Sequence, residues 1–308
     1  MENKKGFNYR QLPLSARGGG LAFSAAVVLN VFVGFIASLI ITASKISGSD
    51  AAKYIGYLTS SVALILTALV VRFLFNQPLR NLTPVRCNPK YILIGLLLIY
   101  GLLFSLNSLN GYLIKLFELL GYTRKSSTLP DLSGWRLLPA ILVIAVLPAV
   151  LEEVLFRGII LNNMEGEVGS LRTVFLVGFL FSLYHGSVEQ TIYQFICGSM
   201  FALLAIRSRS ITPVVLIHFI NNALILVLYS VGALDANGDL IISQGGNIAI
   251  TVTSALCLAG AVVWLILDRK IKFGLVKGEK SSLKGFFIYA AAGIVVTVLT
   301  WVLNLFAL

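Results

Sequence analysis

The stretch VLPAVLEEVLFRGII, Val146 to Ile160, places Glu152, Glu153 and Arg157 inside an apolar run that is long enough to cross a membrane. A charged side chain at the centre of a bilayer costs about 2.5 to 3.5 kcal/mol on insertion scales. Nothing in helix formation requires two adjacent carboxylates at this point. The stretch therefore indicates a membrane-spanning helix that also carries part of a functional site.

The composition of the whole chain indicates the same environment. Hydrophobic residues make up 57% and charged residues only 12% of the sequence, whereas soluble domains carry about 25% charged residues. Apolar windows of about 20 residues, the length of one helical crossing, recur along the chain. We expect an all-α fold, a polytopic transmembrane helical bundle with about eight to nine spans. The expected spans run near residues 21–43, 54–75, 91–113, 137–161, 171–185, 191–206, 211–231, 248–267 and 286–308.

The distribution of Lys and Arg predicts the orientation of the chain, because cytoplasmic loops retain positive charge. Of the 24 basic residues, few fall on the side opposite the N-terminus: Lys45, Lys53, Lys115, Arg124, Lys125 and Arg136. We therefore expect a cytoplasmic N-terminus, and the compact chain with short loops favours a bacterial plasma membrane. The net charge of +11 is expected to face anionic lipid. No soluble basic domain is present, so a nucleic-acid partner is not expected.

The expected organisation has four parts: a cytoplasmic basic N-terminal segment over residues 1–20, a three-span unit over 21–120, a core catalytic bundle over 137–232 and a two-span unit over 248–308. No cleavable signal peptide is expected, because the first apolar run is too long for a signal core. The three cysteines lack C-x-x-C spacing, which predicts neither a disulfide framework nor a thiolate metal site.

The ionisable and amide side chains of the later spans are expected to meet in one layer. Counted from the cytoplasmic helix ends at 1.5 Å per residue, Glu152 lies roughly 15 Å inside, His218 roughly 10 Å and Asn222 roughly 16 Å. His185 lies roughly 21 Å inside, within reach of the same layer if its helix tilts. This counting predicts a cluster on the cytoplasmic side of the membrane.

Helical phase predicts different roles for the two carboxylates. Glu153 and Arg157 are four residues apart and are expected to form an ion pair, which is more often structural than catalytic. Glu152 is rotated by about 100° and lacks a local partner. Pro148, four residues before Glu152, is expected to free the carbonyl of Ile144.

The same spacing argument applies to the histidine segments. His218 and Asn222 share one helix face, with Asn221 held in reserve for the amide role, and Phe181 and His185 share another. The neighbouring polar side chains are interpreted as interhelical hydrogen-bond partners: Tyr184, Tyr193 and Gln194.

An unpaired glutamate, two histidines and a carboxamide in one half-buried cavity supply what water-activated acyl hydrolysis requires. These groups are a general base, a proton shuttle and a donor for the oxyanion. A zinc site made of Glu152, His185 and His218 is an open alternative, although the H-E-x-x-H signature is absent. The sequence is therefore compatible with no cofactor or with one divalent ion such as zinc.

Three motifs in order carry a family resemblance. The segments EEVLFR (Glu152 to Arg157), FSLYH (Phe181 to His185) and HFINN (His218 to Asn222) follow the patterns E-E-x-x-x-R, F-x-x-x-H and H-x-x-x-N. Over residues 137–229 the chain resembles the CAAX protease and bacteriocin-processing family, also called Abi.

The resemblance implies a helical intramembrane endopeptidase whose cavity opens to the cytoplasmic side. By this resemblance Glu152 would activate water that His185 helps to hold, and His218 with Asn222 would stabilise the oxyanion. Supporting roles would fall to Glu153, Arg157 and Phe181. The expected partners are the lipid bilayer and a hydrophobic peptide or membrane-protein tail as substrate.

Two other classes of protein also place polar groups in membranes. A transporter would be expected to show paired repeats and matching broken segments, which this sequence lacks. A non-catalytic immunity or assembly factor that binds a peptide or a partner membrane protein remains the alternative. The presence of Glu152, His185, His218 and Asn222 together favours the enzyme.

Overall fold

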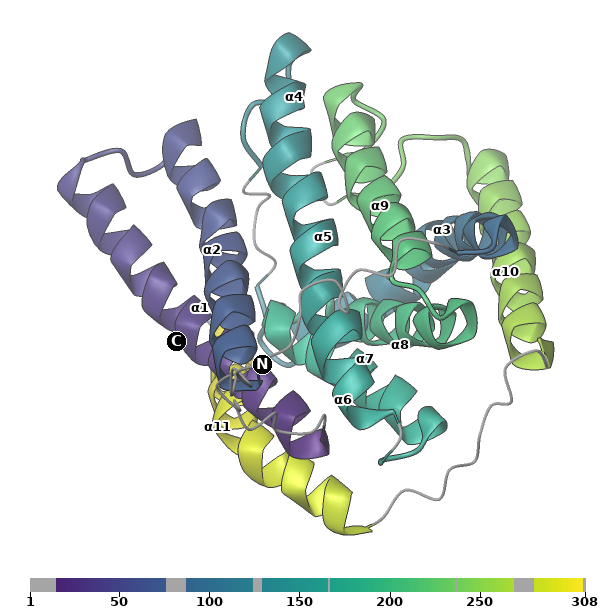
Figure 1. Ribbon diagram of the computed structural model, residues 1–308. Coiled ribbons are helices and arrows are strands. Elements are labelled where there is room, and N and C mark those ends of the chain that lie inside the picture. Colours follow the sequence, from purple (N-terminus) through teal and green to yellow (C-terminus); the bar gives the residue numbers. More distant parts are fainter. Residues whose placement is uncertain are drawn as a thin grey trace, which may run out of the picture.

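The computed structural model describes residues 15–75, 87–123, 129–165, 167–235, 238–268 and 280–306. Most of the predicted basic N-terminal segment, and the basic loop that follows residue 268, lie outside these ranges. The described residues fold into helices, with one isolated bridge between Leu234 and Leu240 and no strand among them (Figure 1). The predicted all-α class is confirmed.

Eight helical stretches in the described chain are long and apolar enough to cross a membrane. They comprise α1 (Ala16–Ala43), α2 (Asp50–Phe75), α3 (Pro89–Leu119), the stretch Gly134–Met164, α8 (Thr191–Ser208), α9 (Thr212–Ser230), α10 (Gln244–Leu267) and α11 (Lys280–Leu305). The ninth expected span is α7 (Ser170–His185), an apolar helix of 16 residues. The chain is an integral, multi-pass membrane protein, with large apolar side chains such as Phe32 and Phe35 exposed for lipid contact.

The fourth span changes its helical pitch twice around the opening motif. It consists of η2 (Gly134–Arg136), α4 (Leu137–Ala140), a π-helical segment η3 (Ile141–Val146), α5 (Leu147–Glu153), a second π-helical segment η4 (Val154–Leu161) and α6 (Asn162–Met164). π-Helical turns are rare and occur frequently at functional sites. Here they flank the short α-helix that ends with the two glutamates.

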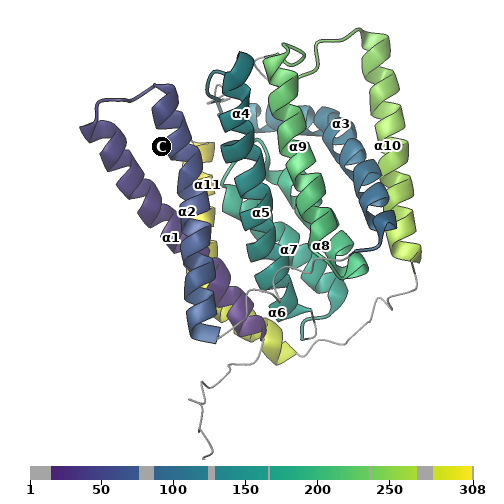
Figure 2. The same ribbon diagram turned by 45° about the horizontal axis from the view of Figure 1, so that its top comes forward.

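The helices pack so that distant parts of the chain meet. The pairs α1 with α11, α3 with α10, and α7 with α8 are in extensive contact, and α9 lies against the fourth span (Figures 1 and 2). The main core lies where η4, α7 and α8 meet, around Phe156, Phe181 and Phe201. The predicted grouping of the first three and the last two spans into units stays a prediction.

Glycines allow the closest of these approaches. A Cβ atom on Gly198 in α8 would lie 2.9 Å from the Cα of Gly178 in α7. A Cβ atom on Gly20 in α1 would clash with the backbone of α11 at Phe286. Small residues at such crossings let transmembrane helices approach closely. The α7–α8 crossing therefore fixes where His185, at the end of α7, is held.

The bundle has two ends, which are distinguishable in Figure 2. At the end that we call the N-terminal end, α1, α3, α7, α9 and α11 begin. At the end that we call the far end, α1, α3, α9 and α11 finish and α2, α10 and the fourth span begin.

Candidate active site

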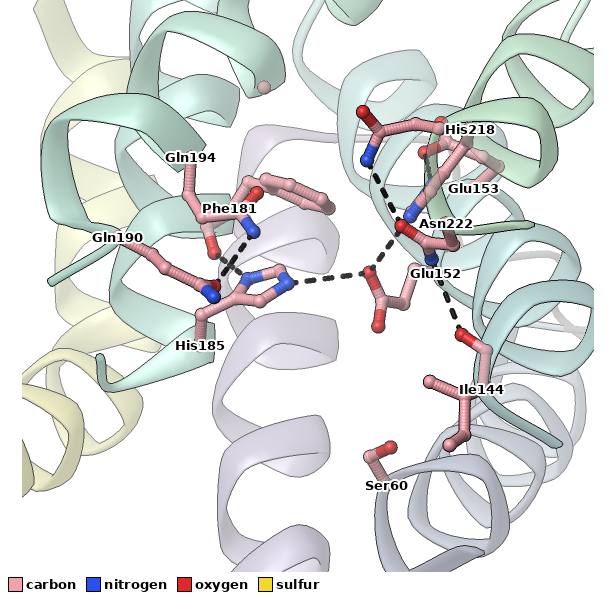
Figure 3. Close-up of polar contacts among 12 residues, drawn as sticks. Ser60, Ile144, Glu152, Glu153, Phe181, His185, Gln190, Gln194, His218 and Asn222 are labelled. Carbon is pink, nitrogen blue, oxygen red and sulfur yellow. Dashed lines mark hydrogen bonds and ion pairs between the residues drawn. The ribbon is translucent and has the colours of Figure 1, made fainter. Parts of the chain in front are cut away.

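The residues of the three motifs come from three helices and surround one space. Glu152 and Glu153 are the last two residues of α5, and His185 is the last residue of α7. His218 and Asn222 lie on one face of α9, as predicted. Figure 3 shows Glu152 between His185 on one side and His218 with Asn222 on the other.

Glu152 is buried and has no close polar partner. Only 6% of the surface of Glu152 is exposed, and its Oε2 atom makes no hydrogen bond. The Nε2 atoms of His185 and His218 lie 3.8 Å and 4.0 Å from this oxygen. Both distances are longer than a direct hydrogen bond. They are suitable for one water-sized polar molecule that the carboxylate and the two histidine nitrogens would share. The predicted lack of a local partner for Glu152 is confirmed.

Each histidine is oriented through its other ring nitrogen. The Nδ1 of His185 lies 2.7 Å from the carbonyl oxygen of Phe181. Because a carbonyl only accepts, this nitrogen carries the hydrogen and Nε2 faces Glu152. The Nδ1 of His218 lies 2.8 Å from Glu153 Oε1. Both rings are therefore held with Nε2 directed at the same carboxylate oxygen.

The link between Glu153 and His218 was missed by the sequence prediction. Glu153 was expected to pair with Arg157, and that pair is present at 2.9 Å with both side chains fully buried. The same Oε1 atom also contacts His218, which comes from a span 65 residues away. Periodicity within one helix cannot reveal a partner on another helix.

Arg157 joins the fourth span to α8. Its Nη2 donates to the carbonyl oxygen of Gly198 at 2.8 Å, and its guanidinium lies 4.7 Å from the ring centroid of Phe181. Burying an arginine is costly unless its charge is paired, and Glu153 supplies that pair. Arg157 thus fixes the Glu153 carboxylate, which in turn holds His218.

A chain of hydrogen bonds orients the amide groups of α9. The hydroxyl of Tyr193 donates to Asn221 Oδ1 at 3.0 Å, and Asn221 Nδ2 donates to Asn222 Oδ1 at 3.1 Å. Asn222 Nδ2 then points to the carbonyl of Ile144, 3.4 Å away. This is the carbonyl that Pro148 was expected to free. The chain presents the amide group of Asn222 as a donor at the site, and Asn221 acts as its support.

The site lies at the inner part of a pocket of about 680 Å³. Its inner wall includes Glu152, Phe181, Cys197, Phe201 and His218. From there the pocket runs to residues of the far end, which include Tyr57, Asn110, Leu129, Tyr229, Leu234 and Asn247.

The direction of this pocket conflicts with the expectations from sequence. The family resemblance implied a cytoplasmic opening, and the basic residues implied a cytoplasmic N-terminus. The pocket extends to the end opposite the N-terminus, so these two expectations cannot both hold. The disagreement arises because counting depth along each helix locates side chains but not the space beside them.

The three side chains considered above as an alternative zinc site, Glu152, His185 and His218, do not fit a zinc ion as they are placed. No group of three or more His, Cys, Asp or Glu side chains in the described residues is arranged to hold a metal ion. The separations of 3.8 Å and 4.0 Å from Glu152 Oε2 to the two Nε2 atoms exceed the roughly 3.4 Å between ligands of a tetrahedral zinc with bonds of about 2.1 Å.

The comparisons with known proteins identify one family. Residues 134–224 match the family described as Type II CAAX prenyl endopeptidase Rce1-like. The matched segment contains all three motifs, which confirms the family prediction made from them. The comparisons with curated proteins and with solved structures give no match. The family match supports a membrane-embedded protease, a hydrolase whose substrate is a peptide.

Proposed function

We propose that this chain, whose central segment carries the Rce1-like pattern, is an intramembrane endopeptidase that hydrolyses hydrophobic or membrane-associated peptides with water activated by Glu152. The observation that carries the proposal is the buried Oε2 of Glu152, without a hydrogen bond and flanked by two histidine Nε2 atoms. A purely structural carboxylate at this depth would be expected to have a close partner, as Glu153 has.

The reaction begins with water held between Glu152 and His185. Glu152 takes one proton as the water oxygen attacks the peptide carbonyl carbon, which gives a tetrahedral oxyanion. His185 is held by the Phe181 carbonyl at 2.7 Å, so its Nε2 can accept a hydrogen bond from the same water. Because the water is oriented by two acceptors, its lone pair is directed at the substrate.

Asn222 and His218 face the oxyanion. Asn222 Nδ2 is directed into the pocket by its bond to the Ile144 carbonyl. A donor role for His218 Nε2 requires hydrogen on both ring nitrogens, and the Glu153 carboxylate at Nδ1 and the oxyanion itself would balance that charge, since Glu152 holds the proton of the water at this stage. When the C–N bond breaks, Glu152 returns its proton to the leaving amine, so that the carboxylate is regenerated.

The pocket suits an extended apolar peptide. Its volume of about 680 Å³ lies within the range for small-ligand sites. Apolar side chains from several helices line it, which include Leu103, Phe104, Ile114, Phe201, Ile225 and Leu226. The scissile bond would lie beside Glu152, His185, His218 and Asn222, which line the same pocket.

The test uses purified protein in detergent with a library of quenched hydrophobic peptides. Cleavage of a subset of peptides, with new termini identified by mass spectrometry, is the expected result. Tight binding of labelled peptides without any cleavage would contradict the proposal and favour the immunity or assembly factor. A parallel assay with a strong chelator should leave the rate unchanged; loss of activity on chelation, restored by zinc, would overturn the metal-free steps.

A further inference from the structure

The residues that line the pocket show toward which end of the bundle the site is open. All its lining residues belong either to the centre of the bundle or to the far end. Residues from the connections at the N-terminal end, such as those between α6 and α7 or between α8 and α9, are not among the described lining residues.

The α7–α8 hairpin contributes its tip to the far side of the pocket. α7 runs from the N-terminal end to the hairpin tip and α8 returns from the tip to the N-terminal end; α7 has 16 residues and α8 has 18. At 1.5 Å per residue these lengths correspond to roughly 24 and 27 Å, less than a hydrocarbon core of about 30 Å. The hairpin tip reaches the ends of α3 and α11, where Glu189 accepts a hydrogen bond from the Tyr122 hydroxyl at 2.7 Å and Val188 packs with Leu305. Glu189 and Gln190 of this tip line the pocket. The pocket lining continues from the tip to Leu234, Leu240 and Asn247 in the connection between α9 and α10 and at the start of α10, at the far end.

The charges of the two ends differ. Among the described residues, the far end carries four basic side chains, Lys45, Lys53, Lys115 and Arg136, and six acidic ones, Asp50, Glu118, Asp131, Glu189, Asp235 and Asp239. The described residues of the N-terminal end carry an excess of positive charge, because Arg17, Arg72, Lys90, Arg172, Arg207, Arg209 and Lys284 outnumber Glu165, Glu167 and Asp268. By the positive-inside tendency this end is cytoplasmic.

We infer that the pocket opens on the extracytoplasmic face, so that the substrate is a peptide segment reached from outside the cytoplasm. The inference rests on the proposed function for the identity of the substrate, and on the geometry and charge of the bundle for its side. It contrasts with the cytoplasmic opening that the family resemblance implied. A membrane peptidase with this orientation would act on translocated tails or on peptides that arrive from outside.

The first test measures the side of the pocket mouth independently of activity. In a chain whose three cysteines are replaced, one new cysteine is placed at Asn247, an exposed residue that lines the pocket, or at Arg209, an exposed residue of the N-terminal end. A membrane-impermeant maleimide should label the Asn247→Cys protein in intact cells and the Arg209→Cys protein only after permeabilisation. The reverse pattern overturns the inference.

The second test measures the side of cleavage. A membrane-impermeant quenched peptide, chosen from those cleaved in detergent, is added to sealed right-side-out or inverted vesicles. Cleavage by right-side-out vesicles alone is expected, and cleavage by inverted vesicles alone overturns the inference. If no peptide is cleaved in detergent, the proposed function fails, whereas the labelling pattern still decides the side of the pocket.

Discussion

Glu152 and Glu153 are neighbours in the sequence, yet they meet opposite surroundings. Glu153 contacts Arg157 and His218 within 2.9 Å through its Oε1 atom, whereas the nearest nitrogens to Glu152 Oε2, those of His185 and His218, are 3.8 Å and 4.0 Å away. This difference follows from the rotation of about 100° between adjacent helical residues. One carboxylate is thereby committed to structure and the other stays available for a proton.

Replacing Glu153 tests its structural role. In Glu153→Gln the buried Arg157 loses its ionic partner, which costs about 3 to 5 kcal/mol of stability for a buried pair. The midpoint of thermal unfolding in detergent should fall clearly. Arg136→Gln, at an exposed ion pair with Asp131, is the matched control and should change it little. Equal unfolding temperatures for the two variants would contradict this role.

Tyr193 is predicted to act as a positioning residue. Tyr193→Phe removes the donor that fixes Asn221 and, through it, Asn222. The free amide loses its preferred orientation, and an unsatisfied buried acceptor costs about 1 to 3 kcal/mol. We expect kcat to fall with KM nearly unchanged. Tyr100→Phe, whose hydroxyl pairs with Thr253 away from the site, serves as the control. An unchanged kcat in Tyr193→Phe with reduced thermal stability would assign Tyr193 a structural role only.

Sequence reasoning at this scale identified the side chains but not all their partners. The Glu153–Arg157 pair and the unpaired Glu152 follow from spacing within one helix, and both are present. The bond from Glu153 to His218 and the Tyr193–Asn221–Asn222 chain cross between helices. Such contacts depend on how helices rotate against each other, which periodicity does not encode. The catalytic roles of Glu152, His185, His218 and Asn222 stay predictions.

At the scale of elements, the α7–α8 crossing holds the site together. Gly198 serves this crossing twice, since its lack of a side chain admits Gly178 and its carbonyl accepts from Arg157. The π-helical segments on both sides of α5 likewise place the two glutamates between regions of altered pitch. Sequence hydropathy predicted these helices well, but it contains no signal for a π-helical turn.

A methyl group at the crossing should disturb the site. In Gly198→Ala the new Cβ would lie 2.9 Å from the Cα of Gly178, so the helices must separate and overpacking typically costs about 1 to 3 kcal/mol. We expect a lower unfolding temperature together with reduced peptidase activity. Gly34→Ala places its methyl group in open space on α1 and should be neutral. A Gly198→Ala protein as stable and active as the Gly34→Ala control would contradict the role of the crossing.

At the scale of the whole molecule, the first and last helices close the bundle. The hydroxyl of Ser24 in α1 donates to the carbonyl of Tyr289 in α11 at 2.7 Å and accepts from the Gly293 backbone at 3.1 Å. α1 also contacts η4 beside the site. The terminal spans therefore support the core although they lie outside the family match over residues 134–224.

This closure predicts a long-range effect of a substitution in α1. Gly20→Val would force α1 away from the backbone of α11 at Phe286. We expect a lower yield of folded protein and a lower unfolding temperature, measured by size-exclusion chromatography and thermal unfolding in detergent. Gly34→Val, on an open face of α1, is the control. A normal elution profile and an unchanged unfolding temperature for Gly20→Val would contradict the closure.

Hydropathy predicted the number and approximate limits of the spans, because burial in lipid is read directly from composition. It did not predict which helices pair, since α1 with α11 and α3 with α10 are far apart in sequence. The direction of the pocket likewise depends on this pairing and on the α7–α8 hairpin, whose tip lines it. For that reason the expected cytoplasmic opening of the cavity and the expected cytoplasmic N-terminus cannot both be correct.

The central claim is that Glu152 activates the water that cleaves the peptide, and the most direct measurement compares kcat for the native protein and Glu152→Gln on one cleaved peptide in detergent. Glutamine keeps the size of the side chain but cannot take a proton. Loss of a general base typically costs about 100-fold to 10,000-fold in rate, so kcat should fall by at least that lower factor. The unfolding temperature should not fall, and Glu118→Gln on the exposed end of α3 should retain full activity. A Glu152→Gln protein that cleaves the peptide at the native rate would contradict the account.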